Sequence, residues 1–326
     1  MYDEYMSLFY VHCRKRTGFQ KLIFSISPIN IIKENISMSK YKYNKDYFNK
    51  IDTADKAYWL GFLYADGSIN RYYKNEKLRS MTLEIGLADK DRNHLEKFKK
   101  CLDSNIPIFE RINKLKGKEY KSVRIQLNNT KICYDLCDLG CTPHKTYDIK
   151  FPTFDIVPKN FMRDFIRGFF DGDGCISISE MNGKPHIFTT ITGMSDMLQS
   201  ISDFLISEKI IRIKPKIHKD NRRDFTYSVY IYGIDSNKEF LDYLYKDSYI
   251  YLNRKFNQYI NFYKDFDDKS NKHGVYYDKL HNVYVASIVI NGKRKTSRYK
   301  TIDEAINVRK NFEIEKMNIE NSSLNQ

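Results

Sequence analysis

The apolar positions of residues 52–68 recur with a helical period, which predicts the first regular element of the chain. Asp52 or Thr53 is suited to cap its start, because a short polar side chain there accepts a hydrogen bond from an otherwise unpaired amide. Gly67 is expected to end this helix. Residues 1–40 show no such periodicity, and we expect them to form an N-terminal extension without regular order.

Residues 158–177 repeat the same pattern. Pro158 is suited to the first position of this second helix, and Gly174 is placed to end it. Two copies of one pattern, followed by similar segments, indicate a duplicated unit.

The segments after the two helices also correspond. A further helix is opened by Asp89 in the first half and by Ser195 in the second. Strands are expected at 81–87, 122–127, 175–179, 187–192 and 227–232, and closing helices near 131–139 and 237–245. The predicted fold class is therefore α+β, with two tandem half-domains of order α-β-β-α-β-β-α forming a pseudo-dimer.

A third, smaller unit is predicted near the C-terminus. Asn291-Gly292 lies between two alternating segments, which is a strong hairpin signal, and a helix is expected from Thr301. This unit should be a small three-stranded sheet with one helix. The chain then divides into an extension at 1–40, half-domains at 41–152 and 153–268, the small unit at 271–316 and a polar tail at 317–326.

Both motif helices carry small residues four positions apart, namely Gly61 with Ala65 and Gly168 with Gly172. This spacing gives one smooth helix face, where a second backbone can approach closely. If the two faces pack together, Asp66 and Asp173 meet at the same end. Two adjacent carboxylates repel unless cations lie between them, and Mg²⁺ prefers such oxygen ligands. A pair of metal ions so held can hydrolyse a phosphodiester.

The charge of the chain favours a polyanionic partner. Lys and Arg number 55 against 41 Asp and Glu, a net charge of +14. Basic side chains displace the counterions condensed on nucleic acid, so binding to DNA or RNA is expected. No segment is long and apolar enough to suggest a membrane span or a secretory signal. The six cysteines are sparse, which favours a reducing, intracellular setting (cytoplasmic, organellar or phage-encoded) over secretion.

WLGFLYADG at 59–67 and IRGFFDGDG at 166–174 resemble the motifs of the LAGLIDADG homing endonucleases in their single-chain, two-motif form. The resemblance runs roughly from Tyr41 to Lys264. It implies a monomer that cuts both strands of a long DNA site and belongs to a mobile, intron-homing element. It also implies that Asp66 and Asp173 bind the metal, with the carbonyls of Ala65 and Gly172 as supplementary ligands. The sixth motif position departs from the family in the first half, where Tyr64 replaces the acid that Asp171 keeps.

The resemblance further implies a basic residue near the metals and a sheet in the DNA major groove for each half. Lys145 and Lys255 are the candidate catalytic lysines, and a role in contacting phosphate or solvent stays open for both. The candidate DNA-binding residues of the two sheets are Arg71, Arg79, Lys121, Arg124, Lys184, Lys216, Arg222 and Arg223.

The C-terminal unit resembles the APETALA2-type DNA-binding domain. GVYYD, VYVASIVINGKR and the TIDEAINVRKNFE helix carry this resemblance, although Tyr284 stands where that domain often has tryptophan. It implies DNA contacts from Arg294, Lys295, Arg298 and Tyr299. A basic module that binds RNA or protein is the alternative.

The sequence thus predicts a metal-dependent, site-specific endodeoxyribonuclease that acts on double-stranded DNA with Mg²⁺. Two alternatives remain: a maturase that binds intron RNA and assists splicing, and a DNA-binding regulator that does not cleave. The intact pair Asp66 and Asp173 favours cleavage.

Overall fold

The computed structural model describes residues 41–115, 117–143, 149–181, 184–220, 224–270, 274–278 and 280–323. Contacts divide the chain into residues 1–38 and 39–326, and everything described below lies in the second unit. The predicted extension at 1–40 falls outside the described residues. Among the helices of these ranges, none combines the length and the apolar character needed to cross a membrane.

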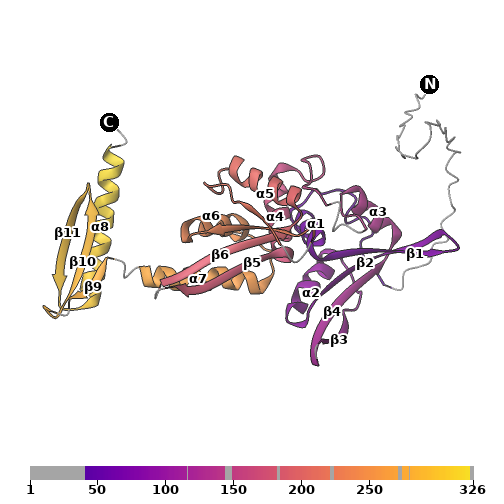
Figure 1. Ribbon diagram of the computed structural model, residues 1–326, viewed down its shortest axis with the longest axis horizontal. Helices are drawn as coiled ribbons and strands as arrows, with labels where there is room; N and C mark the ends of the chain where they lie inside the picture. The colour runs from indigo at the N-terminus through magenta and orange to yellow at the C-terminus, as the bar shows by residue number, and fades with distance from the viewer. Residues whose placement is uncertain are drawn as a thin grey trace, which may run out of the picture. The chain divides into compact units, whose positions relative to one another are not determined.

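The first half is a four-stranded antiparallel sheet with the strand order β1-β2-β4-β3, accompanied by helices (Figure 1). In chain order its elements are α1 (Ala54–Asp66), β1 (Gly67–Lys74), β2 (Lys77–Ala88), the 3₁₀ turn η1 (Asp89–Asp91), α2 (Arg92–Cys101), β3 (Phe109–Leu115), β4 (Lys118–Asn128) and α3 (Thr130–Asp138).

The second half repeats this architecture, with the strand order β5-β6-β8-β7. Its elements are η2 (Lys159–Phe161), α4 (Met162–Asp173), β5 (Gly174–Met181), β6 (Lys184–Gly193), α5 (Ser195–Ser207), β7 (Ile217–Lys219), β8 (Tyr227–Tyr232), α6 (Ile234–Tyr245) and α7 (Asn253–Ser270). The predicted α+β class and the duplicated α-β-β-α-β-β-α order are confirmed. α7 is an additional helix.

The two sheets each bury one face. Alternate residues of the central strands are buried in the core, among them Leu83, Ile85, Ile187 and Ile191. Because side chains alternate across a strand, the residues between them lie on the opposite, outer face. One continuous core includes residues of both halves, so the halves fold against each other.

The helix starts differ in detail from the sequence prediction. Thr53 is the N-cap of α1 and its Oγ1 accepts from the amide of Lys56 at 3.4 Å, whereas Asp52 pairs with the Lys56 side chain. Pro158 precedes a 3₁₀ turn, and α4 begins only at Met162, so Pro158 is not its first residue.

Ser195 and Asp89 were also expected to be caps, and neither is. Ser195 is the first residue of α5 and Asp89 begins η1. Helix ends commonly tighten into such turns, and a sequence pattern does not resolve them.

Gly67 and Gly174 follow the last residues of α1 and α4, as predicted, but in extended conformation rather than as left-handed caps. A Cβ at Gly67 would lie 2.7 Å from the carbonyl oxygen of Leu63, and one at Gly174 would lie 2.5 Å from that of Phe170. Close approach of the chain to the last helical turn therefore requires glycine at both positions.

The C-terminal module consists of β9 (Val275–Asp278), β10 (Val283–Ile290), β11 (Lys293–Tyr299) and α8 (Ile302–Ser323), with the sheet order β11-β10-β9. Ala286, Ile288, Ala305 and Phe312 form a core of its own. The predicted hairpin is present, with positive φ at Asn291 and Gly292.

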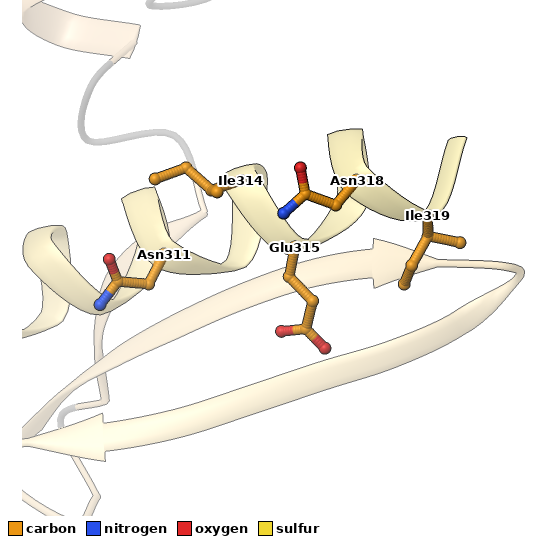
Figure 2. A pocket seen from close by; sticks show the side chains of 5 residues that line it. All are labelled: Asn311, Ile314, Glu315, Asn318 and Ile319. Atoms are coloured by element: carbon orange, nitrogen blue, oxygen red, sulfur yellow. The ribbon is translucent and has the colours of Figure 1, made fainter. Parts of the chain in front are cut away.

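α8 continues to Ser323, into the segment predicted as a polar tail at 317–326. Neither Gly nor Pro occurs in this stretch to end the helix. A hollow beside α8 is lined by Asn311, Ile314, Glu315, Asn318 and Ile319 (Figure 2). Its single ionised side chain, Glu315, is paired with Lys295, so the hollow offers no catalytic group.

Candidate active site

The two motif helices, α1 and α4, pack through their backbones. A Cβ at Gly61 would lie 2.0 Å from the carbonyl oxygen of Phe165, and one at Gly168 would lie 1.9 Å from that of Tyr58. No side chain fits at either distance. The small-residue face noted in the sequence is therefore where the two helices touch.

The same packing brings the C-terminal ends of α1 and α4 together. A Cβ at Gly172 would lie 2.2 Å from Cβ of Ala65 and 3.4 Å from Oδ2 of Asp66. Asp66 is exposed and Asp173 is partly buried, so both carboxylates are accessible at this end. The arrangement holds the carboxylate of one half against the backbone of the other.

The oxygen ligands available at this end suit Mg²⁺, which keeps several water ligands and is not usually enclosed by protein ligands alone. Among the described residues, no group of three or more His, Cys, Asp or Glu side chains could surround a metal ion. Asp66 and Asp173 are two carboxylates with backbone carbonyls beside them, and Mg²⁺ usually binds one or two carboxylates while keeping water and phosphate oxygens. The residues present therefore fit this ion.

Lys255 lies beneath the end of α4. Its Nζ donates hydrogen bonds to the carbonyl oxygens of Phe170, at 2.6 Å, and Asp171, at 2.8 Å, and lies 5.1 Å from the centre of the Phe170 ring. Burial lowers the pKa of Lys255 to about 8, while the charges of Asp171 and Asp66 act to raise it. Lys255 thus fixes the helix turn that precedes Gly172 and Asp173. Lys145, the corresponding candidate in the first half, lies outside the described residues.

Asp171, which the sequence marks only as the acid kept at the sixth motif position, is buried and accepts several hydrogen bonds. Its carboxylate accepts hydrogen bonds from Tyr58 Oη at 2.7 Å, Tyr245 Oη at 2.6 Å and the amide of Leu252 at 2.7 Å. Burial raises the pKa of Asp171, and the charge of Lys255 opposes that shift. The carboxylate links α4 to α1 of the other half, to α6 and to the segment before α7.

The equivalent first-half position, Tyr64, uses a different contact. Its hydroxyl donates to the carbonyl oxygen of Leu139 at 2.6 Å and occupies the space where Gly140 would carry a Cβ. In place of the acid, Tyr64 therefore makes a contact within its own half, whereas Asp171 also contacts the other half.

Arg167, at the second motif position, is also buried. It donates to the carbonyl oxygens of Ile250 at 2.8 Å and Leu244 at 3.1 Å, and its guanidinium lies 5.3 Å from the centre of the Tyr58 ring. Its charge is paired with Asp164 at 2.6 Å. The sequence signal for this role is the spacing of Arg167 three residues after Asp164 and four before Asp171, which puts all three on one helix face.

His94 completes the network on the first-half side. Its Nε2 lies 3.0 Å from Tyr58 Oη. Because the Tyr58 hydroxyl donates its own proton to Asp171, it accepts the hydrogen bond from His94, and Nε2 therefore carries a proton. Nδ1 is buried and has no hydrogen-bond partner in the structure. Burial lowers the pKa of His94 to about 3, with Lys97, Lys255 and Arg254 adding to the shift.

The first sheet separates its candidate DNA-binding residues by face. Arg124 lies on the outer face, 3.6 Å from Glu84. Arg71 and Lys121 instead alternate with it, in phase with buried residues such as Met81 and Val123. Arg79 is skipped at a bulge in the register of β1 and β2, so alternation does not assign it to a face. The strand alternation therefore puts Arg124, and neither Arg71 nor Lys121, on the face opposite the helices.

Of the candidate DNA-binding residues in the second half, several side chains lie outside the part of the chain that the structure describes. Lys216 is exposed just before β7. Arg222 and Arg223 lie outside the described residues, as does the side chain of Lys184.

In the C-terminal module, Arg294 and Arg298 lie on one face of β11 and are exposed. Lys295 lies on the other face, where it pairs with Glu315 at 2.6 Å and lies 4.7 Å from the centre of the Phe312 ring. Tyr299 packs against the module core. Lys295 and Tyr299 therefore support the module itself.

Residues 160–245 match the family model described as LAGLIDADG-like domain. The matched range includes α4 with Asp173, the whole second sheet and α6.

Among curated proteins, the chain is 26% identical over 191 residues to the probable translation initiation factor IF-2 of Methanocaldococcus jannaschii. That alignment covers 56% of this chain but only 14% of the relative, so the chain spans about a seventh of that protein's length.

Solved structures similar to this chain include two that are bound to DNA. One is the LAGLIDADG homing endonuclease I-GzeII in complex with its DNA target, with 12% identity, a TM-score of 0.45, and coverage of 66% of this chain and 92% of that one. The other is I-LtrWI bound to target DNA, with 13% identity, a TM-score of 0.45, and coverage of 70% and 93%.

Proposed function

We propose that this chain is a site-specific endonuclease that hydrolyses both strands of a double-stranded DNA target at the paired ends of α1 and α4. The observation that carries the proposal is the backbone packing of the two motif helices, which holds Oδ2 of Asp66 over Gly172. Neighbouring carboxylates repel, so such an arrangement is favourable when cations neutralise it. The match of residues 160–245 to the LAGLIDADG-like domain supports the same reading.

Asp66 and Asp173, with the carbonyls of Ala65 and Gly172, are the residues proposed to hold Mg²⁺. Bound there, the ions would stabilise the attacking and leaving oxygens of the phosphodiester. Lys255 acts as a positioning residue, because it secures the two carbonyls that precede Gly172 rather than facing solvent. One chain supplies both halves of the site, so a monomer suffices.

The outer faces of the two sheets are proposed to bind the DNA major groove on either side of the cut. Side chains that project from strands can contact base edges there. The C-terminal module is proposed to add DNA contacts through Arg294 and Arg298, the exposed arginines of β11.

The proposal is tested by incubating the full chain with a randomised double-stranded DNA library, with Mg²⁺ or with EDTA, and sequencing the ends. We expect Mg²⁺-dependent breaks with short 3′ overhangs at one long motif. Asp66→Asn and Asp173→Asn should each abolish double-strand cleavage and leave binding largely intact. Asp155→Asn, at an exposed aspartate before η2, is the control and should cut normally.

Cleavage by Asp66→Asn or Asp173→Asn at the wild-type rate would refute the metal assignment. Enrichment of one motif by binding, without breaks, would indicate a regulator. Binding to intron RNA in place of duplex DNA would indicate a maturase.

A further inference from the structure

The outer face of the second sheet has an unusual composition. With the alternation set by buried Ile187, Ile191, Val229 and Ile231, it presents serine, threonine, cysteine, histidine and aromatic side chains. The residues concerned are Cys175, Ser177, Ser179, His186, Phe188, Thr190, Thr192, His218, Ser228, Tyr230 and Tyr232. None of these described side chains is Asp, Glu, Lys or Arg.

Five of these side chains form a continuous group, which we call the aromatic group: His186, Phe188, His218, Tyr230 and Tyr232. The ring of Phe188 lies 5.9 Å from that of Tyr232 and 6.3 Å from that of Tyr230, and the two tyrosine rings stack at 5.8 Å. His186 and His218 extend the group on either side, at 6.1 and 5.5 Å. An apolar surface on a sheet face away from the core indicates a binding role.

The described residues at the equivalent positions of the first sheet form no such group, although Phe109, which pairs with Arg124 as His218 pairs with Ser228, is an exposed aromatic residue. The strand registers define which positions of the two sheets are equivalent. Gly67 pairs with Ile85 in the first half, and Gly174 pairs with Ile191 in the second. Counting from these pairs, the outer-face residues correspond as Thr82 with Phe188, Glu84 with Thr190, Arg124 with Ser228, Gln126 with Tyr230 and Asn128 with Tyr232.

Apart from Thr82, the residues of this first-half set are charged or carry an amide, and three of them are in contact. Glu84 accepts a hydrogen bond from Gln126 at 2.5 Å and lies 3.6 Å from Arg124. Arginine and glutamine are the side chains that form paired hydrogen bonds with guanine and adenine in the major groove. The two outer faces therefore differ in the kind of contact that they can make with bases.

On the proposed function, on which this step rests, the second sheet lies in the major groove of one half of the target. We propose that its outer face recognises thymines in that half-site through their C5-methyl groups. Thymine is the base that carries an apolar group in the major groove, and phenylalanine and threonine side chains contact that methyl favourably. The neutral hydroxyl groups around the aromatic group can form hydrogen bonds with bases of either DNA strand, without a preference for guanine.

The position of the aromatic group sets where these thymines lie. Cys175 and Ser177, which are paired with Thr190 and Phe188, come two and four residues after Asp173. A strand rises about 3.3 Å per residue, so the two rows lie roughly 7 and 13 Å from that aspartate along the strand. The preference should therefore occur within the first few base pairs outside the cut.

The test uses the full chain and a randomised duplex DNA library, from which the bound site is recovered. The recovered site is then made with deoxyuridine in place of thymine in one half at a time, because deoxyuridine pairs as thymine does but lacks the methyl. We expect deoxyuridine to weaken binding in one half-site by roughly fourfold for each contacted methyl. Substitution in the other half-site should have a smaller effect.

Tyr232→Ala identifies the half-site concerned. Tyr232 is 59% exposed, so its removal leaves the core intact. This variant should reduce the deoxyuridine penalty in the thymine-containing half-site, whereas Asn128→Ala, the matched change in the first sheet, should leave that penalty unchanged.

Equal affinity for thymine and deoxyuridine duplexes would overturn the inference while leaving the endonuclease proposal in place. So would a penalty that Asn128→Ala reduces and Tyr232→Ala does not. Failure to bind any duplex, or a preference for single-stranded RNA, would overturn both proposals.

Discussion

The hydroxyl of Tyr58 in α1 donates a 2.7 Å hydrogen bond to Oδ2 of Asp171 in α4, so a buried polar contact joins the two halves beside the candidate metal site. Tyr58→Phe would leave Asp171 with one donor fewer in a site without water access. Removing one partner of a buried hydrogen bond costs about 1–3 kcal/mol, and more when the other is charged. We expect a loss of that size in the free energy of unfolding, measured by denaturant titration.

A double-mutant cycle with Asp171→Asn separates this contact from other effects. Asn presents an amide group toward a site of hydrogen-bond donors, so the single variant should be strongly destabilised and the cycle should give a coupling energy of about 0.5–3 kcal/mol. Tyr134→Phe, on an exposed tyrosine of α3, is the control. A loss for Tyr58→Phe no greater than the control's would show that the contact does not join the halves.

Gly61→Ala tests the backbone packing of α1 on α4. The added methyl would lie 2.0 Å from the carbonyl oxygen of Phe165, and a backbone atom cannot rotate away as a side chain can. Overpacking typically costs about 1–3 kcal/mol, and we expect the upper end of this range or beyond. The midpoint of thermal or denaturant unfolding measures it. Gly86→Ala is the matched control, because a Cβ there meets nothing within 4 Å. Similar midpoints for the two variants would contradict the close packing.

His94 should make the protein sensitive to acid. Burial lowers the pKa of His94 to about 3 in the folded state, whereas an unfolded histidine has its ordinary pKa of about 6.5. Below pH 6.5 the unfolded chain binds the extra proton and the folded chain does not. His94 therefore destabilises the fold progressively as the pH falls from 6.5 toward 3, by up to about 1.4 kcal/mol per pH unit.

The measurement is the free energy of unfolding between pH 7 and pH 4.5, compared with a His94→Phe variant. Phe keeps the ring contacts with Trp59 and Phe62 but cannot titrate. The variant should be less stable at pH 7, because Tyr58 loses a donor, and should lose less stability on acidification. Parallel pH curves would rule out His94 as the titrating group.

Much of the fold followed from the sequence because the motif was doubled. Gly61 and Gly168 fall at matching positions in matching helices, and their spacing predicts a shared face whatever the surrounding packing is. The strand alternation and the Asn291-Gly292 turn are likewise local signals. The short edge strands and α7 were not identified, since long-range pairing rather than their own pattern defines them.

The candidate site was predictable only where local spacing determines it. Asp66 and Asp173 end their helices, and the pairing of α1 with α4 brings these two helix ends together. Asp171 receives its partners from α1, α6 and the segment before α7, which no spacing along the chain reveals. The face on which a basic residue lies depends on strand register, and so Arg71 and Lys121 could not be distinguished from Arg124 by composition.

The C-terminal module provides the last test, because two of its basic residues face away from its helix and a third does not. If Arg294 and Arg298 contact phosphates, each change to Ala should weaken binding and reduce the slope of log affinity against log salt by about 0.9. Lys295→Ala removes the same charge, but Lys295 is already paired with Glu315, so it should lower the stability of the module with little change in slope. Titrations of a labelled duplex at several salt concentrations give the slopes. Equal slope changes for all three variants would mean that net charge, and not this face of β11, determines binding by the module.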